Sequence, residues 1–231
     1  MLILNLGCGS KTCNNPNVIS IDWSISLILK MNFFFKIFLS NFLSKERYLK
    51  IKALPNNILV HNLKKGIPYL NNSVDVVYHS HLLEHLDRSK AKNFLIEIFR
   101  VLKPDGIQRI VVPDLYFLCK SYIDNYEKYD FINETSEKHD DFVSAILEQS
   151  VRKEAYGSSQ QNIFLRKIEN ILLGDARKRG ETHQWMYDKL NLTNLLKEIG
   201  FKNIQVKTYC TSDIDNWNNY GLDLDQGDLE Y

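Results

Sequence analysis

The chain has 231 residues, with 29 Lys and Arg against 28 Asp and Glu, so its formal net charge is +1 at pH 7. This length fits one domain of ordinary to large size, or one domain with a substantial insertion. The balanced charge gives no sign of the basic domain or stripe that nucleic-acid binding usually needs, and we therefore expect no nucleic-acid partner.

Short apolar runs predict the strands of an open, mostly parallel α/β sheet. Each run ends at polar residues, which is typical of strands that are buried on both faces. A helix with an apolar face follows the fourth run, over Ala91–Leu102, and ends before Pro104 and Gly106. The alternation of strand, helix and strand predicts helices on both faces of the sheet. The predicted strands are Leu2–Leu6, Val18–Asp22, Asn57–His61, Val74–His79 and Gln108–Val112.

An apolar segment, Ser24–Leu43, follows the second strand. Lys30 and Lys36 interrupt it, which argues against a membrane span. We expect a core-facing helix or a flap over a pocket, and peripheral contact with a membrane surface is the alternative. The 4 cysteines form no C-x-x-C pair, and no basic leader with a cleavage site is recognisable, so we expect a cytoplasmic protein.

Residues 115–180 predict a helical insertion that serves as a possible substrate cap. After it, Asp188 predicts the start of a helix that runs to Ile199 and ends at Gly200. A last strand is expected over Asn203–Tyr209. We thus expect a single domain over 1–231, with a cofactor-binding half at 1–114 and a C-terminal helix and strands at 181–231.

A glycine-rich turn, Gly7-Cys8-Gly9, follows the first strand. Glycines at this position let a ligand approach the backbone closely. Thr12 stands where the dinucleotide fingerprint needs a third glycine, which argues against a nicotinamide-dependent oxidoreductase. Asp22, at the end of the second strand, can accept both hydroxyls of a ribose, although it could also cap a turn. Only residues 10–21 separate Gly9 from Asp22, so the crossover helix between them must be very short.

Taken together, these motifs resemble class I S-adenosylmethionine-dependent methyltransferases. More narrowly, they resemble a bacterial subgroup associated with cell-surface polysaccharide biosynthesis. The resemblance covers residues 2–114 and 180–225 and implies a Rossmann-like methyltransferase sheet. The motifs that carry it are "LNLGCGS", "ISIDWS", "NSVDVVYHSHLLEHL", "IFRVLKPDGIQRIVVPD" and "HQWMYDKLNLTNLLKEIGF".

The resemblance implies S-adenosyl-L-methionine as the cofactor and a small-molecule or saccharide acceptor that is methylated at a hydroxyl. By this resemblance, Asp22 would hold the ribose of the cofactor, Trp23 would lie beside its adenine, and His79 would lie near its methionine part. The full set implied to contact the cofactor is Gly7, Cys8, Gly9, Asp22, Trp23, Asn62, Leu63 and His79.

The sequence departs from the family pattern at Asn5, Lys11 and Asn62. The family often has an acidic residue where Asn5 stands, a glycine where Lys11 stands and Asp where Asn62 stands. These departures keep open a second reading, a degenerate and non-catalytic methyltransferase fold that acts as a binding or membrane-surface module.

Histidines gather after the fourth strand, in "YHSHLLEHL". A hydroxyl acceptor must lose a proton, most simply to a histidine or a carboxylate. We expect His81, His85 and the distant His183 to be catalytic. Two alternatives stay open: these residues and Glu84 could bind a divalent metal, or they could have a structural role. The sequence by itself assigns no residue to a metal.

Near the C-terminus, "WNNYGLDLD" combines aromatic and acidic side chains, namely Trp217, Tyr220, Asp223 and Asp225. Such a combination could contact a sugar. A tail that packs across the edge of the sheet is the slightly favoured alternative. The oligomeric state is not apparent from the sequence.

Overall fold

The computed structural model describes residues 1–24, 27–28, 30, 49, 52–128, 136–150, 182–208 and 211–223. The chain divides into two compact units. The first comprises Met1–Ser80, Phe94–Ile110 and Lys207–Leu229. The second comprises His81–Asn93, Val111–Val206 and Glu230–Tyr231. Each unit is considered by itself below.

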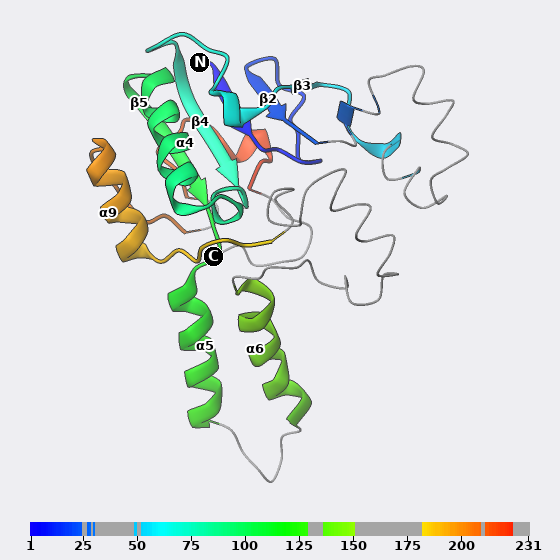
Figure 1. The fold of residues 1–231 in the computed structure, drawn as a ribbon, viewed down its shortest axis with the longest axis vertical. Helices are drawn as coiled ribbons and strands as arrows, with labels where there is room; N and C mark the ends of the chain where they lie inside the picture. Colours follow the sequence, from blue (N-terminus) through cyan, green and yellow to red (C-terminus); the bar gives the residue numbers. More distant parts are fainter. Residues whose placement is uncertain are drawn as a thin grey trace. The chain divides into compact units, whose positions relative to one another are not determined.

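The first unit is built on an open 5-stranded sheet with the order β3-β2-β1-β4-β5 (Figure 1). β1 pairs in parallel with both β2 and β4, and β2 pairs in parallel with β3. The strand order therefore reverses between β1 and β4, which is where open α/β sheets bind ligands. The Rossmann-like fold class predicted from the sequence is confirmed. The strands are β1 (Ile3–Leu6), β2 (Val18–Asp22), β3 (Ile58–Val60), β4 (Val74–Ser80) and β5 (Leu102–Val111).

The core of this unit forms around β1, whose residues are all buried. The predicted helix is present as α4 (Arg88–Val101), and its Leu95 and Ile98 are fully buried while Phe99 is exposed. One apolar face thus covers the core and the opposite face meets water. No helix joins β1 to β2, in agreement with the short crossover expected there.

The fifth strand differs from its prediction because it begins at Leu102, directly after α4, and includes the "KPDG" segment. A Cβ on Gly106 would lie 3.0 Å from the Lys103 carbonyl oxygen and 3.1 Å from that of Asp75. Gly106 therefore permits a close approach of two backbone segments. We had expected these residues to form only a turn, and the left-handed φ of 65° at Asp105 retains that feature within the strand.

Arg100, in the last turn of α4, holds the loop that precedes β4. Its guanidinium donates to the carbonyl oxygens of Ile67 at 2.9 Å and Tyr69 at 2.8 Å, and to Asn71 Oδ1 at 2.9 Å. It also forms a two-pronged pair with the Glu97 carboxylate, with both distances 2.8 Å. These hydrogen bonds from Arg100 lower the pKa of Glu97.

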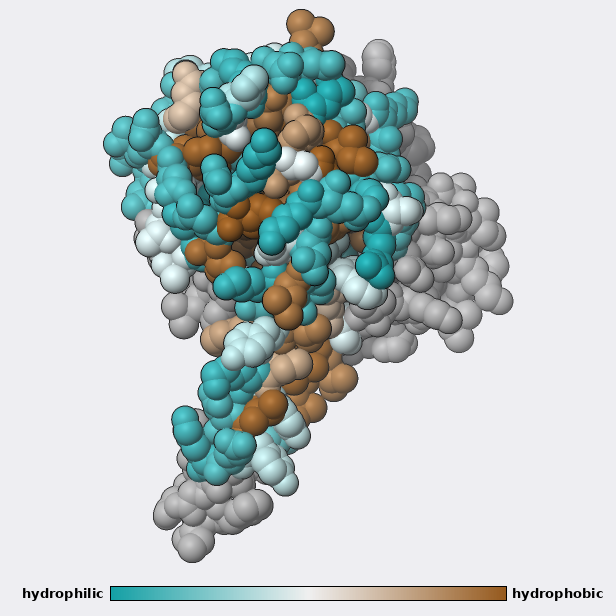
Figure 2. Space-filling model, turned by 90° about the vertical axis from the view of Figure 1, so that its left-hand side faces the viewer, coloured by the Kyte–Doolittle hydropathy of each residue, from teal (hydrophilic) through white to brown (hydrophobic). Residues whose placement is uncertain are grey.

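The second unit contains η2 (Leu83–His85), α5 (Leu115–Lys128), α6 (Ser136–Gln149) and α9 (Lys189–Ile199). α5 and α6 pack side by side (Figure 1), and Figure 2 shows apolar as well as hydrophilic side chains on their surface.

α9 begins and ends at the residues expected from the sequence. Asp188 accepts the N–H groups of Leu190 and Asn191 at 2.8 Å each, and Gly200 ends the helix in the left-handed conformation.

The strand predicted over Asn203–Tyr209 is wrong for the residues that the structure describes, since 201–208 are irregular. Asn203 has a φ of 52°, which breaks an extended run at its start. Thr208 and Thr211 close a turn, in which the Thr211 N–H donates to the Thr208 carbonyl at 3.0 Å. Tyr209 lies outside the described residues.

None of the described helices is long and apolar enough to cross a membrane. The segment Ser24–Leu43, for which we weighed a core helix, a flap and membrane contact, lies almost wholly outside the described residues. Leu27 is one of the few residues described in it, and it is buried against Cys8 and Ile58.

Candidate functional site

The glycine-rich turn at the end of β1 presents backbone rather than side chains. Gly7 and Gly9 have φ values of 64° and 55°, which glycine adopts without strain. A Cβ on Gly9 would meet no atom within 4 Å, so the space outside it is open. The Cys8 side chain is buried beside Leu27 and Ile58. Burial, reinforced by the charge of Asp22, raises the pKa of Cys8 to about 12.

Asp22 joins this turn to the end of β2. The Gly9 N–H donates to Asp22 Oδ2 at 2.5 Å, and the Trp23 N–H donates to Oδ1 at 2.5 Å. Each carboxylate oxygen keeps a lone pair for a further donor such as a ribose hydroxyl. The side chain thus serves as a turn cap, and it keeps the acceptor capacity that the cofactor role requires. Trp23 is 50% exposed, so its ring is accessible to a planar group.

Asn5 is a positioning residue whose role we did not foresee from the sequence. It is buried in β1, and its amide nitrogen donates to the Lys11 carbonyl at 2.8 Å. The far end of the glycine-rich turn is thereby tied to the strand that precedes it. A carboxylate at this position could accept but not donate, so Asn suits this chain where the family often has an acidic residue. The sequence shows an amide two residues before the glycine-rich turn, but its burial and its hydrogen-bond partner are known only from the structure.

Asn62 and Leu63 follow β3, next to the end of β2. The His61 N–H donates to the Asp22 carbonyl at 3.0 Å, which fixes the start of this segment. Asn62 Oδ1 accepts the Lys64 N–H at 3.0 Å and so caps η1 (Leu63–Lys65). A contact to adenine through the same oxygen would use its remaining lone pair.

His79 lies inside the core of the first unit. Its ring is fully buried and packs edge-on against Phe94, with centroids 5.4 Å apart. Its Nε2 lies 3.2 Å from the Gln108 side-chain nitrogen. The ring thus has a packing role here, and only the backbone of His79 is left for the predicted contact with a cofactor.

A histidine–carboxylate cluster, Glu84, His85 and His183, forms in the second unit. One ligand-capable atom of each lies within 4.8 Å of the others. The main chain brings them together, since the Glu84 carbonyl accepts the N–H groups of Gln184 at 2.7 Å and Trp185 at 3.3 Å. The rings of His85 and His183 meet nearly at right angles, with centroids 4.7 Å apart.

His81 lies beside this cluster, with Nδ1 3.3 Å from Oε1 of the buried Glu84. Its φ of 49° is left-handed, a conformation that costs energy for a residue with a Cβ. Burial lowers the pKa of His85 although the charge of Glu84 opposes the shift, which favours a neutral ring. The structure therefore gathers His81, His85 and His183, the predicted catalytic residues, around one carboxylate.

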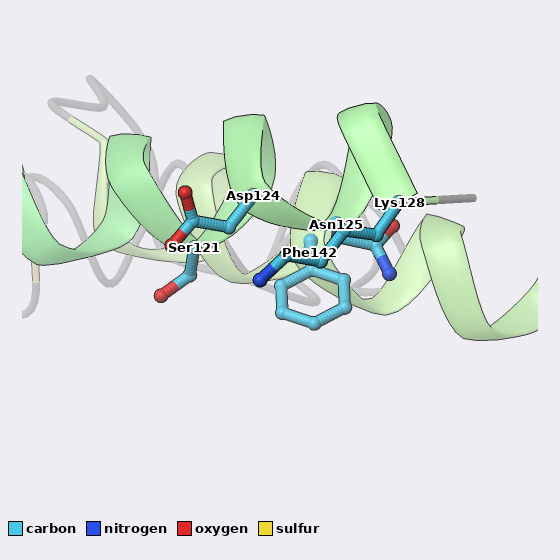
Figure 3. Close-up of a pocket in the computed structure, with 5 residues that line it drawn as sticks. All are labelled: Ser121, Asp124, Asn125, Lys128 and Phe142. Atoms are coloured by element: carbon cyan, nitrogen blue, oxygen red, sulfur yellow. The ribbon is translucent and has the colours of Figure 1, made fainter.

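A separate pocket lies between α5 and α6 (Figure 3). Ser121, Asp124, Asn125 and Lys128 of α5 line it together with Phe142 of α6. None of the predicted site residues lines this pocket. It is therefore distinct from the residues around the glycine-rich turn and from the histidine–carboxylate cluster.

The aromatic and acidic residues near the C-terminus support the packed-tail interpretation. Trp217 and Asp223 are both buried in the first unit. The Asp223 carboxylate accepts the Trp217 indole N–H at 2.6 Å and pairs with Arg109. The Tyr220 ring packs against Trp217, with centroids 5.9 Å apart. Asp225 lies outside the described residues.

Residues 40–110 match a family model described as a methyltransferase domain. The matched range includes β3, β4 and α4 but neither the glycine-rich turn nor Asp22. Over this part the chain is similar to a methyltransferase domain, which agrees with the S-adenosylmethionine cofactor expected from the sequence. None of the curated proteins matches the chain.

Solved structures show only distant similarity. An S-adenosylmethionine-dependent methyltransferase from Methanosarcina mazei is 17% identical over 87% of this chain and 79% of its own, with a TM-score of 0.45. A possible histamine N-methyltransferase from Thermotoga maritima is 14% identical over 87% of this chain, with a TM-score of 0.41. This chain covers 64% of the length of the Thermotoga protein, which is less than two thirds. At this level the similarity does not bear on function, and the fold rests on the strand order itself.

Proposed function

We propose that this protein transfers a methyl group from S-adenosylmethionine to a hydroxyl of a small-molecule or saccharide acceptor. The single observation that carries the proposal is the junction of Gly9 and Asp22. It places an open glycine-rich turn against a carboxylate that keeps free acceptor capacity, at the end of β1, the strand that borders the point where the strand order reverses.

The residues around this junction suit the parts of the cofactor. The backbone of Gly7, Cys8 and Gly9 would line the methionine end, since the Cys8 side chain is turned into the apolar core. Asp22 would accept the ribose hydroxyls, and the exposed Trp23 ring would lie against the adenine. The turn holds no third glycine for a diphosphate, so the ligand expected here lacks one.

Bound S-adenosylmethionine supplies an electrophilic methyl group on a sulfonium, so that the acceptor oxygen bonds to carbon as the C–S bond breaks. The protein must then align the acceptor and take up the hydroxyl proton. His81, His85 and His183 are the proposed acceptors of that proton. The lowered pKa of His85 supports this role, because a neutral imidazole can accept a proton at neutral pH.

Titration calorimetry tests the cofactor assignment. We expect wild type to bind S-adenosylmethionine and its demethylated product but not NAD. The Asp22→Asn variant should bind both much more weakly. Asp213→Asn is the matched control, because Asp213 is an exposed carboxylate in the same unit that pairs with Lys207. Binding of NAD alone would support an oxidoreductase, and binding of none of the three would support a non-catalytic fold.

The acceptor class is tested by mass spectrometry of candidate sugar intermediates after incubation with protein and cofactor. A mass increase of one methyl group that resists mild base would support methylation at a hydroxyl rather than at a carboxylate. The resemblance to the polysaccharide-associated subgroup makes such sugars the first compounds to test.

A further inference from the structure

We propose that Glu84, His85 and His183 form a binding site for a divalent transition metal, with Zn²⁺ as the best-suited ion. Two imidazoles and a carboxylate make up a donor set typical of zinc sites that keep one position open. One ligand-capable atom of each residue lies within 4.8 Å of the others. This inference concerns binding by the second unit alone and does not rest on the proposed methyl transfer.

The protonation state of the His183 ring leaves one nitrogen with a lone pair that a metal can use. His183 Nδ1 lies 2.9 Å from the Gln149 carbonyl oxygen, which can only accept, so Nδ1 carries the proton and Nε2 keeps its lone pair. The His85 Nδ1 is buried and has no hydrogen-bond partner among the described residues. A backbone carbonyl that holds one ring nitrogen is the usual support for a metal-binding histidine.

The Glu84 carboxylate supplies the second, independent observation. Glu84 is 1% exposed, and neither of its oxygens has a hydrogen-bond donor among the described residues. The His81 ring, which can carry positive charge, lies beside this carboxylate, with Nδ1 3.3 Å from Oε1. A buried carboxylate without donors is strongly unfavourable, and a bound cation removes that penalty.

The main chain has already placed the ligands close to a binding geometry. Tetrahedral zinc with bonds of about 2.1 Å holds its ligand atoms about 3.4 Å apart, so small side-chain rotations are enough to close the site. The Gln184 side chain also donates to the His85 carbonyl at 2.9 Å, which fastens the two segments together. With a metal bound, His85 and His183 no longer offer a lone pair to a proton. Of the three proposed proton acceptors, His81, at the rim and about half exposed, then remains for that role.

Cobalt titration of the chelator-treated, full-length protein tests the site. We expect one Co²⁺ to bind per chain, with the visible absorption of a tetrahedral site and without the intense near-ultraviolet bands of thiolate ligation. His183→Ala and His85→Ala should each weaken binding at least tenfold. His139→Ala is the matched control, because His139 lies in α6 of the same unit and pairs with Asn125 instead.

Circular dichroism verifies that each variant is folded, and His183→Gln serves if the alanine variant is not. The proposal is overturned if wild type binds no stoichiometric Co²⁺, if thiolate bands accompany binding, or if His183→Ala binds Co²⁺ as tightly as wild type.

Asp22→Asn should retain Co²⁺ binding, and His183→Ala should retain S-adenosylmethionine binding. Failure of the metal site is thereby distinguished from failure of the proposed function.

Discussion

The Gly9 N–H donates to the Asp22 carboxylate at 2.5 Å and so joins the ends of two neighbouring strands. The carboxylate proposed to hold the ribose is therefore also part of the wall that shapes the site. This arrangement fixes the carboxylate before a ligand arrives, which reduces the entropy lost on binding.

Asp22→Asn should weaken S-adenosylmethionine binding about tenfold to a hundredfold, because hydrogen bonds to a charged group contribute about 1.5–3 kcal/mol. Asparagine has one acceptor oxygen and cannot serve Gly9, Trp23 and two ribose hydroxyls together. Calorimetric dissociation constants measure the effect. Unchanged affinity, with Asp213→Asn as the comparison, would remove Asp22 from the site.

Asn5→Asp should lower the free energy of unfolding by about 1–3 kcal/mol, because it removes the donor to the Lys11 carbonyl and places a charge at a buried position beside it. Urea unfolding measures the change. Asn218→Asp, at an exposed position of the same unit, should leave stability nearly unchanged. Equal effects of the two variants would contradict the role given to Asn5.

The Glu97–Arg100 pair should make stability depend on pH in the acid range. Arg100 holds the folded-state pKa of Glu97 below its ordinary value of 4.5, so the stabilisation is complete above that value and is lost as the pH falls through the folded-state pKa. The gap in unfolding free energy between wild type and Glu97→Gln should be largest near neutral pH and should narrow as the pH falls below 4.5. A gap independent of pH would contradict this assignment.

Cys8 should react with iodoacetamide far more slowly than the exposed Cys119. The raised pKa of about 12 leaves almost no thiolate on Cys8 at about pH 8, and the buried sulfur is also inaccessible. Peptide mass mapping over a time course gives the rate at each cysteine. Comparable rates would mean that the glycine-rich turn opens readily in solution.

Asp223→Ala should lower the free energy of unfolding by about 3 kcal/mol, because it leaves the largely buried Arg109 without its partner. It also removes the acceptor of the Trp217 indole. Asp213→Ala breaks an exposed pair with Lys207 and should cost less than about 1 kcal/mol. Urea unfolding of the two variants provides the comparison.

Sequence patterns predicted the elements that are marked by neighbouring residues, such as apolar runs for strands and capping residues for a helix. Four strands fall within one residue of their predicted ends, and α9 begins after Asp188 and ends at Gly200 as expected. The strand expected over Asn203–Tyr209 had the right composition, but strand formation also requires a partner, which a single segment does not reveal. The early start of β5 depends on the close approach at Gly106, which is likewise a tertiary feature.

For the candidate site, the sequence likewise predicted the positions of residues along the chain but not the side chains that surround them. The sequence placed Asp22 at the end of a parallel strand and left a turn cap as one of its two interpretations, and the structure shows that its carboxylate accepts the Gly9 N–H. The donor role of Asn5 and the burial of the His79 ring depend on which side chains face them, so sequence spacing could not indicate either. Glu84 drew attention as a neighbour of histidines, but only the structure shows that its carboxylate is buried without hydrogen-bond donors among the described residues.

The inward orientation of Cys8 has a consequence for selectivity. A ligand resting on this turn meets only peptide groups, which have the same chemistry in every protein and cannot distinguish one small molecule from another. In this part of the first unit, discrimination between ligands would then fall to the side chains of Asp22 and Trp23.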